Sequence, residues 1–381
     1  MMTVSTTAAM LADSAARILS DHCTPAVLRA ADLGGAALAQ AHAAVGDSAA
    51  AAAAYAAENA PRRVEAALAA LRPLWSALDG AGLVRSLAPE GDGGAGLGWG
   101  DVRGMLEAAG RFAAPVPLAD TTAACALARA AGVAPPAGAA TLGVARFDDG
   151  ARRVIAEGVA HASQAQWVAC TLPGEVPGEH RFHIFAVEGA VREDSVNIAG
   201  EQRSRMSWPT DSALCVGTLP PGMDALVAGA AVRVAQIAGG CARVVELAGT
   251  YANTREQFGR PIAKFQALQQ QLALAGEWSA MAAMASRLAL SSEGLGLDAA
   301  RVAAAKQVAG TAVETCNRVA HAVHGAIGVT GEYDLQLHTR HLWAWAADFG
   351  SSLLWAGVLG RALLAGHEDR VWDEVVRLSA A

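Results

Sequence analysis

The sequence lacks any block of positive charge. Lys and Arg number 29 and Asp and Glu number 36 in 381 residues, which leaves a formal net charge of −7. A protein that follows a nucleic-acid backbone needs clustered Lys and Arg side chains, and no segment of this chain supplies such a cluster. Nucleic acid is therefore not an expected partner.

Cysteine motifs and long apolar runs are missing as well. The six cysteines show no CxxC or Cys/His spacing of a zinc site, so we expect no metal and reduced, buried thiols in a cytoplasmic protein. No stretch reaches the roughly 18 uninterrupted apolar residues of a membrane span. Asp13 and Ser14 interrupt the amino terminus, which has no basic start before an apolar core. We expect neither a membrane span nor a signal peptide.

Hydrophobic periodicity divides the chain into three parts. Helical spacing of apolar residues, as from Val64 to Leu78, covers the first part, and it returns in long pieces from Met223 onward, with shorter stretches after Asp334. Between these parts, short apolar or alternating runs separated by Gly, Asp and Pro predict strands. The sequence thus predicts an α+β, mostly α fold: an N-terminal helical domain (1–138), a small β domain (139–220) and a C-terminal antiparallel four-helix bundle (221–381). Strands are expected at 141–147, 153–159, 166–171, 181–187 and 212–216.

Three acidic residues are expected at helix starts or in the loops before them. Asp224 precedes the first bundle helix, where a negative charge is favourable. Glu332 and Asp334 are expected as loop and N-cap carboxylates of a helix beginning near Leu335.

The run from Thr254 to Ala273 forms a corner between two long helices. Gly259 and Pro261 end the first helix, because glycine accepts the left-handed conformation and proline lacks the N–H needed to continue. Arg255, Gln257 and Gln266 flank this corner, where a guanidinium fork and amides could hold a phosphate or a polar ring edge. An exposed arginine beside an ordinary helix end is the alternative.

A second candidate segment lies between Val323 and Trp343. Gly325 and Gly328 would let backbone N–H groups approach a pyrophosphate or an adenine closely. An ordinary turn between helices is the alternative, and His324 at the helix end could contact either a cofactor or terminal carbonyl groups.

Several segments together resemble the acyl-CoA dehydrogenase family. Gly82 to Leu97 looks like the family's PEE-GG-GL loop, and Val323 to Trp343 is similar to its HGGxG turn at the adenine half of FAD. The resemblance implies FAD as cofactor, an acyl-CoA substrate, an oligomer of similar chains and an electron-transfer flavoprotein as electron acceptor. The implied cofactor-binding residues are Arg255, Gln257, Phe258, Gln266, Gln269, His324, Gly325 and Gly328.

The chain departs from the family where a catalytic base is expected. Family chemistry removes an α-proton with a glutamate that stands before a Gly-Thr or Gly-Ser pair, and here Phe349 precedes Gly350. Asp348 is one residue earlier, which rotates a helical side chain by about 100°. The other usual position, at the start of the first bundle helix (227–233), has no carboxylate.

Cofactor-binding marks of the family are also missing. No TEP-x-GSD-like or Trp-Ile-Thr-like strand is found, and Ala322 and Ala326 replace a glutamine and a glycine of the adenine turn. These losses resemble the reduced partner subunit of heteromeric acyl-CoA dehydrogenases that act on steroid side-chain CoA thioesters. Three hypotheses follow: a subunit that binds FAD at an interface with a base-supplying partner, a self-sufficient homo-oligomer that uses Asp348, or a flavin-free structural subunit.

Overall fold

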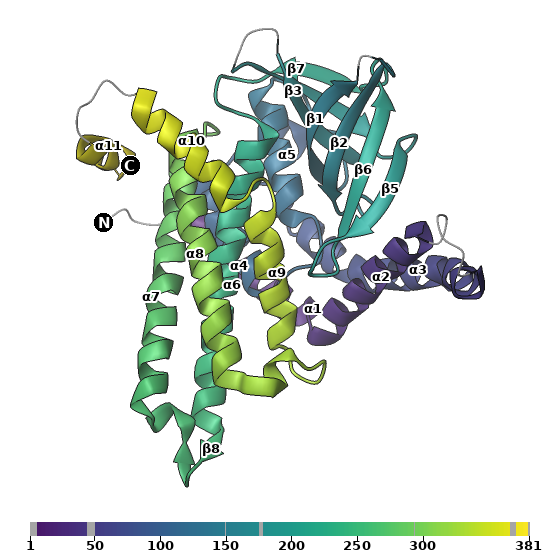
Figure 1. The fold of residues 1–381 in the computed structure, drawn as a ribbon. Coiled ribbons are helices and arrows are strands. Elements are labelled where there is room, and N and C mark those ends of the chain that lie inside the picture. The colour runs from purple at the N-terminus through teal and green to yellow at the C-terminus, as the bar shows by residue number, and fades with distance from the viewer. Residues whose placement is uncertain are drawn as a thin grey trace.

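The computed structural model describes residues 6–43, 50–148, 150–174, 178–292, 294–365 and 371–379. N-terminal helices come first, a sheet follows, and long helices form a bundle beside both (Figure 1). The predicted α+β, mostly α class is therefore confirmed. The N-terminal helices are α1 (Thr6–His22), α2 (Pro25–Ala43), α3 (Ala50–Gly80), α4 (Trp99–Arg111) and α5 (Leu118–Ala130).

The sheet has seven strands in the order β5-β6-β2-β1-β3-β4-β7. Strands β1 and β3 are parallel and the other neighbours are antiparallel. Both faces are covered at its centre: Trp167 and Ala169 of β3 join the main core, while Val168 and Cys170 join a second apolar cluster on the other face. The strands are β1 (Ala140–Asp148), β2 (Arg153–Ala160), β3 (Trp167–Pro173), β4 (His180–Ala186), β5 (Val191–Val196), β6 (Gln202–Pro209) and β7 (Cys215–Thr218).

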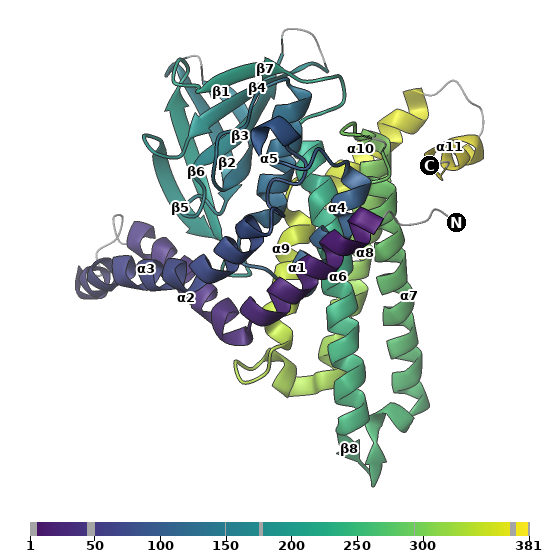
Figure 2. The ribbon, with the colours of Figure 1, turned by 180° about the vertical axis from the view of Figure 1, so that it is seen from behind.

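The bundle is built around α6, which contacts helices from both ends of the chain. Helix α4 packs on α6 from the N-terminal part, and α7, α8 and α9 pack on it from the bundle (Figure 2). By length and composition α6 could cross a membrane, but 89% of its most apolar window is buried within the protein, as in a core helix. The bundle helices are α6 (Ala225–Thr254), α7 (Gln266–Ala289), α8 (Ala299–His324), α9 (Leu335–Ala347), α10 (Ser352–Ala365) and α11 (Val371–Ser379).

Asp224 and Asp334, the acidic residues predicted at helix starts, make different contacts in the structure. Asp224 caps α6, since its side chain accepts a hydrogen bond of 2.7 Å from the Val227 N–H. Asp334 occupies the N-cap position of α9 but makes no cap bond. The predicted N-cap position is therefore confirmed, but the carboxylate accepts from Arg29 of α2 at 2.6 Å in an ion pair instead of making a capping hydrogen bond.

The predicted domain limits at 138/139 and 220/221 fall in the link between α5 and β1 and in that between β7 and α6. As limits of separate domains they stay a prediction. All six cysteines are free thiols, and five of them are buried.

Candidate cofactor corner and buried ionic cluster

The corner between α6 and α7 projects from the lower end of the bundle in Figure 1. A two-stranded hairpin, β8 (Glu256–Gln257) and β9 (Arg260–Pro261), forms its tip, with Phe258 at φ 52° and Gly259 at φ 76°. The Phe258 side chain is 91% exposed. Left-handed backbone is uncommon for a bulky residue, and an aromatic ring exposed to this extent buries little apolar area within this chain. The tip therefore presents a large apolar side chain to its surroundings.

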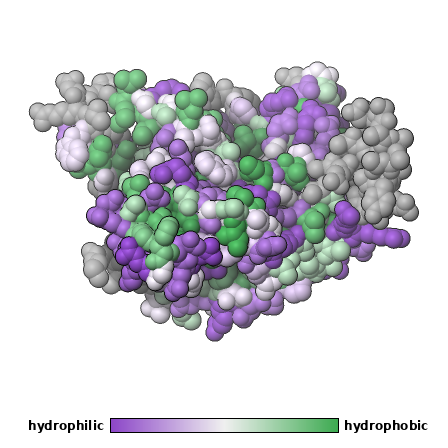
Figure 3. Space-filling model, turned by 60° about the horizontal axis from the view of Figure 1, so that its bottom comes forward, coloured by the Kyte–Doolittle hydropathy of each residue, from purple (hydrophilic) through white to green (hydrophobic). Residues whose placement is uncertain are grey.

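Phe265 supports the tip from the start of α7. Its ring lies edge-to-face with that of Phe258 at 6.0 Å, and the Arg260 guanidinium lies 4.4 Å from its centroid. Arg255 makes no side-chain hydrogen bond or ion pair within the described chain and is exposed. Figure 3, which brings the lower end of the molecule forward, shows small hydrophobic patches broken up by hydrophilic residues on this face. The guanidinium and the exposed ring remain available to a ligand or another chain.

The three predicted glutamines lie at the same corner but differ in what their amides do. Gln257 and Gln266 are exposed, without side-chain partners in the described chain. The Gln269 Nε2 group donates to the Ala263 carbonyl at 2.9 Å, so this amide stabilises the corner itself. As cofactor contacts, all three stay predictions.

The glycine segment meets the corner through Tyr251, on the last turn of α6. His324 ends α8, is 4% exposed and stacks on the Tyr251 ring at 4.4 Å. Its Nδ1 lies 2.8 Å from the Ala320 carbonyl, as in the helix-end alternative. Gly325 follows at φ 62° and is exposed, whereas Gly328 is buried against His324. The structure places this segment beside the corner, but the His324 ring packs inside the chain.

Asp348, the predicted base, lies in a buried ionic cluster of five charged residues. Its Oδ2 accepts from Arg203 Nη2 at 2.6 Å and from Arg233 Nε at 3.1 Å. Arg233 also donates to Asp120 at 3.0 Å, and Arg203 to Glu201 at 3.0 Å. Helix α5, the loop before β6, β6 itself, α6 and the end of α9 each supply members. Burial of so many charges is tolerated only because each is paired.

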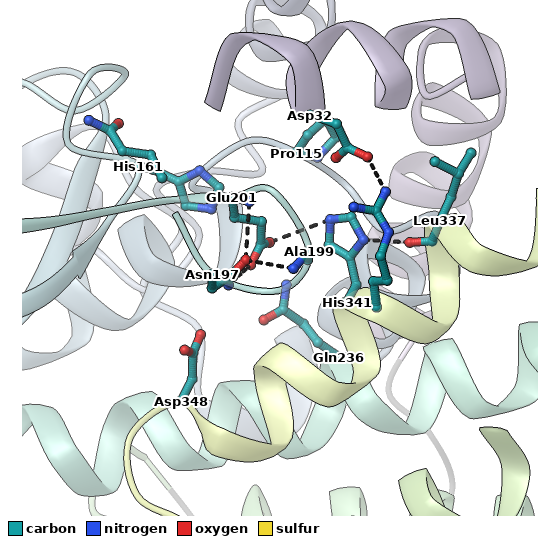
Figure 4. Close-up of polar contacts among 12 residues, drawn as sticks. Asp32, Pro115, His161, Asn197, Ala199, Glu201, Gln236, Leu337, His341 and Asp348 are labelled. Atoms are coloured by element: carbon teal, nitrogen blue, oxygen red, sulfur yellow. Dashed lines mark hydrogen bonds and ion pairs between the residues drawn. The ribbon is translucent and has the colours of Figure 1, made fainter. Parts of the chain in front are cut away.

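Glu201 is the most strongly perturbed carboxylate of the buried ionic cluster. Burial alone would raise its pKa, but the positive charges of Arg203 and Arg233 hold the pKa of Glu201 well below its ordinary value. Its Oε1 lies 3.6 Å from His341 Nε2, and its Oε2 accepts from Asn197 at 2.8 Å (Figure 4). Glu201 is therefore held as a carboxylate rather than poised to exchange a proton.

The two stretches that the resemblance gives for a base meet beside this cluster. A Cβ atom on Gly229, near the start of α6, would overlap the ring of Phe349. Phe349 has φ 51°, and the Arg233 guanidinium lies 5.4 Å from its ring centroid. An aromatic ring thus fills the place where the two stretches come together. As a catalytic base Asp348 stays a prediction, and its two arginine partners argue against it.

Lys306 of α8 lies beside the buried ionic cluster and is 1% exposed. Its Nζ donates to the carbonyl oxygens of Trp345 at 2.7 Å and Asp348 at 2.9 Å, at the end of α9. Burial is the main cause that lowers the pKa of Lys306; Asp348 opposes this effect and Arg233 adds to it, and the resulting pKa is about 7. A neutral amine keeps two N–H donors, so both hydrogen bonds can persist after the proton leaves.

We expect the free energy of unfolding to rise between about pH 7 and pH 10.5 because of Lys306. The unfolded chain keeps a proton on this amine up to its ordinary pKa of 10.5, whereas the folded chain releases it near 7. Folding therefore releases a proton in this interval, and higher pH favours the folded state by at most about 1.4 kcal/mol per pH unit. Urea unfolding at several pH values would measure the rise. Lys306→Met should abolish this part of the slope, and an unchanged slope would refute the assignment.

Comparison with known sequences identifies the family. A family model described as "Acyl-CoA dehydrogenase, C-terminal domain" matches residues 222–363. Acyl-CoA dehydrogenase FadE34 of Mycobacterium tuberculosis is 30% identical over 334 residues, which cover 81% of this chain and 45% of FadE34. Acyl-CoA dehydrogenase IpdE2 of the same organism is 28% identical over 327 residues, which cover 82% of this chain and 92% of IpdE2. The chain thus spans about half the length of the first relative and most of the second.

Solved structures show the same fold. A Tcur3481–Tcur3483 steroid ACAD variant aligns with a TM-score of 0.74 and 22% identity over 95% of this chain and 99% of its own. A chain of the ChsE4–ChsE5 complex from Mycobacterium tuberculosis aligns with a TM-score of 0.69 and 20% identity over 96% and 99%. The sequence and structural matches agree, and the chain belongs to the acyl-CoA dehydrogenase family.

Proposed function

We propose that this chain is a subunit of an FAD-dependent dehydrogenase that forms the α,β double bond of an acyl-CoA thioester. In this proposal a second chain of the same fold supplies the catalytic base, and FAD lies at the interface between the two. The exposed Phe258 and the unpartnered Arg255 at the corner are the main support, because the Phe258 ring is 91% exposed and the Arg255 side chain makes no hydrogen bond or ion pair within the described residues.

The residues at the corner fit FAD chemically. A free guanidinium suits a phosphate, and the exposed Gln257 and Gln266 amides suit polar edges of a ring. The 24-residue helix α7 starts here, and Phe265 at its N-cap offers no capping side chain, so unpaired backbone N–H groups add to the anion-binding character. Bound FAD would supply the oxidant, and this chain would hold and orient it.

The proposed division of labour follows from the buried ionic cluster. Asp348 is held by Arg203 and Arg233, and Phe349 fills the contact with Gly229. The stretch 227–233 has no carboxylate, and one oxygen of Asp348, Oδ2, accepts hydrogen bonds from both arginines. Two of the similar solved structures carry paired names, ChsE4–ChsE5 and Tcur3481–Tcur3483, which is in keeping with a two-chain assembly. The electron acceptor, the cytoplasmic location and the acyl group stay predictions.

Flavin content tests this proposal. We expect FAD to co-purify with this chain and an acyl-CoA dehydrogenase-fold partner expressed together, and Arg255→Ala to weaken FAD binding about 10- to 100-fold through loss of a charge-assisted hydrogen bond. Absorbance of the flavin per mole of assembly measures this. Arg287→Ala is a matched control, because it removes an exposed arginine from the far half of α7.

The same experiment separates the other two hypotheses. Unchanged flavin in Arg255→Ala would overturn the shared-site proposal, and no flavin in any assembly would favour a structural subunit. A chain that is yellow without a partner, is bleached by an acyl-CoA and loses bleaching in Asp348→Asn would instead be a self-sufficient enzyme.

A further inference from the structure

A small cavity lies where α2 and α3 meet the β domain and α9. Its volume is about 50 Å³. Apolar side chains of α3, among them Leu68 and Leu71, line one part, and His161, Glu201 and His341 line another (Figure 4). The cavity is amphipathic, so an occupant needs an apolar body and at least one polar atom.

His161 presents an unused donor at the polar part. It is 7% exposed, and its backbone has φ 53°. Gln164 Nε2 lies 3.1 Å from the Pro115 carbonyl, which can only accept, and 3.3 Å from His161 Nδ1. The first contact fixes the orientation of the Gln164 amide, with its nitrogen as the donor. The same nitrogen therefore donates to His161 Nδ1, which is an acceptor without a proton. In a neutral His161 ring the proton is therefore on the His161 Nε2 atom.

Burial keeps the imidazole neutral, because it lowers the pKa of His161 more than Asp120 and Glu201 raise it. No hydrogen-bond partner is found for the Nε2 atom among the described residues. The His161 Nε2 atom is not completely enclosed either, because it is absent from the set of enclosed polar atoms that lack a partner. A free N–H donor on a cavity wall is suited to an oxygen acceptor.

The surrounding charges select against an ionic occupant. Asp32 and Glu201 line the cavity, and no lysine or arginine among the described lining residues could pair with an anion. Both carboxylates already have cationic partners, Arg340 for Asp32 and Arg203 for Glu201, which leaves no uncompensated charge for a cation. A neutral oxygen acceptor avoids both difficulties.

We propose that this cavity binds a small neutral carbonyl compound, whose oxygen accepts a hydrogen bond from His161 Nε2–H and whose apolar part contacts Leu68 and Leu71. The volume limits the occupant to a few heavy atoms, since a cavity of roughly 150 Å³ is known to accept benzene. The site is separate from the corner at Arg255, and its occupation does not depend on a shared flavin.

Acetone and acetate are a matched pair of probes, because they have nearly the same shape and differ in charge. We expect acetone to shift the His161 Nε2 resonance of the ¹⁵N-histidine-labelled full chain saturably, with a dissociation constant on the order of millimolar. Acetate should cause no saturable shift. Acetone binding should be lost in Leu68→Trp, which fills the apolar part, while the Nε2–H tautomer persists there.

Two further variants test the hydrogen bond. His161→Leu should abolish the stabilisation of the protein by acetone, followed as the thermal midpoint, whereas His161→Asn should retain part of it. Asparagine accepts the left-handed backbone and keeps an N–H donor. An Nδ1–H tautomer, a non-saturating shift, an equal response to acetate, or stabilisation that survives in His161→Leu or Leu68→Trp would each overturn the proposal.

Discussion

Replacing Arg233 with methionine is expected to lower the free energy of unfolding by about 3–5 kcal/mol. The side chain is 1% exposed, and among the described residues it alone pairs with both Asp120 of α5 and Asp348 after α9. Methionine has a similar length but no charge, so the variant would leave Asp120 buried without a cationic partner. Urea unfolding monitored by circular dichroism would measure the loss.

Arg205→Met is the control for this prediction. Arg205 pairs with Glu157 at 3.0 Å and Glu193 at 3.2 Å, but all three side chains are largely exposed. Such pairs contribute about 0–1 kcal/mol, so this variant should stay close to the wild type. Equal stabilities of Arg233→Met and Arg205→Met would show that the buried ionic cluster does not stabilise the packing of α5, α6 and the end of α9.

Gly239→Ala is expected to destabilise the protein by about 1–3 kcal/mol or more, as overpacking in a tight core does. Helices α4 and α6 cross in backbone contact: a Cβ atom on Gly239 would overlap the Glu107 carbonyl, and one on Gly110 would overlap the Gln236 carbonyl. Because the obstructing atoms are backbone atoms, the helices would have to move apart. Thermal unfolding would show a lower midpoint.

Gly249→Ala provides a comparison within the same helix. A Cβ atom there meets nothing within 4 Å. Alanine in a helix interior is favoured over glycine by about 0.5–1 kcal/mol, so this variant should be slightly more stable than the wild type. If both alanine variants behaved alike, helix propensity rather than the crossing of α4 and α6 would explain the result.

Periodicity was sufficient to predict the helices and four strands, but it could not reveal β5 and β6. Val191–Val196 and Gln202–Pro209 contain several charged residues, which weaken a strand signal. In the structure these charges have partners: Arg205 pairs with Glu157 and Glu193 on neighbouring strands. The partners lie 12 to 48 residues away, so no local pattern could show them. The last predicted strand, 212–216, was displaced, and β7 begins at Cys215.

The corner was predictable and the buried ionic cluster was not. Glycine followed by proline is a local signal, and Gly259 does adopt the left-handed backbone that the signal implies. The cluster joins residues separated by more than 100 positions, as Arg233 and Asp348 are. One clue was present: Arg233 is the only charged residue in the run from Ala225 to Cys241. A lone arginine in so apolar a helix needs a buried counter-charge.

Helix α6 carries Arg233 near its beginning and ends immediately before Arg255. The two residues are 22 positions apart, which corresponds to about 33 Å along a helix at 1.5 Å per residue. A partner that bound at the far end of α6, as proposed, would therefore not contact the buried ionic cluster through this helix. Substitutions near Arg255 would then change binding with little effect on thermal resistance, whereas substitutions near Arg233 would have the opposite balance of effects.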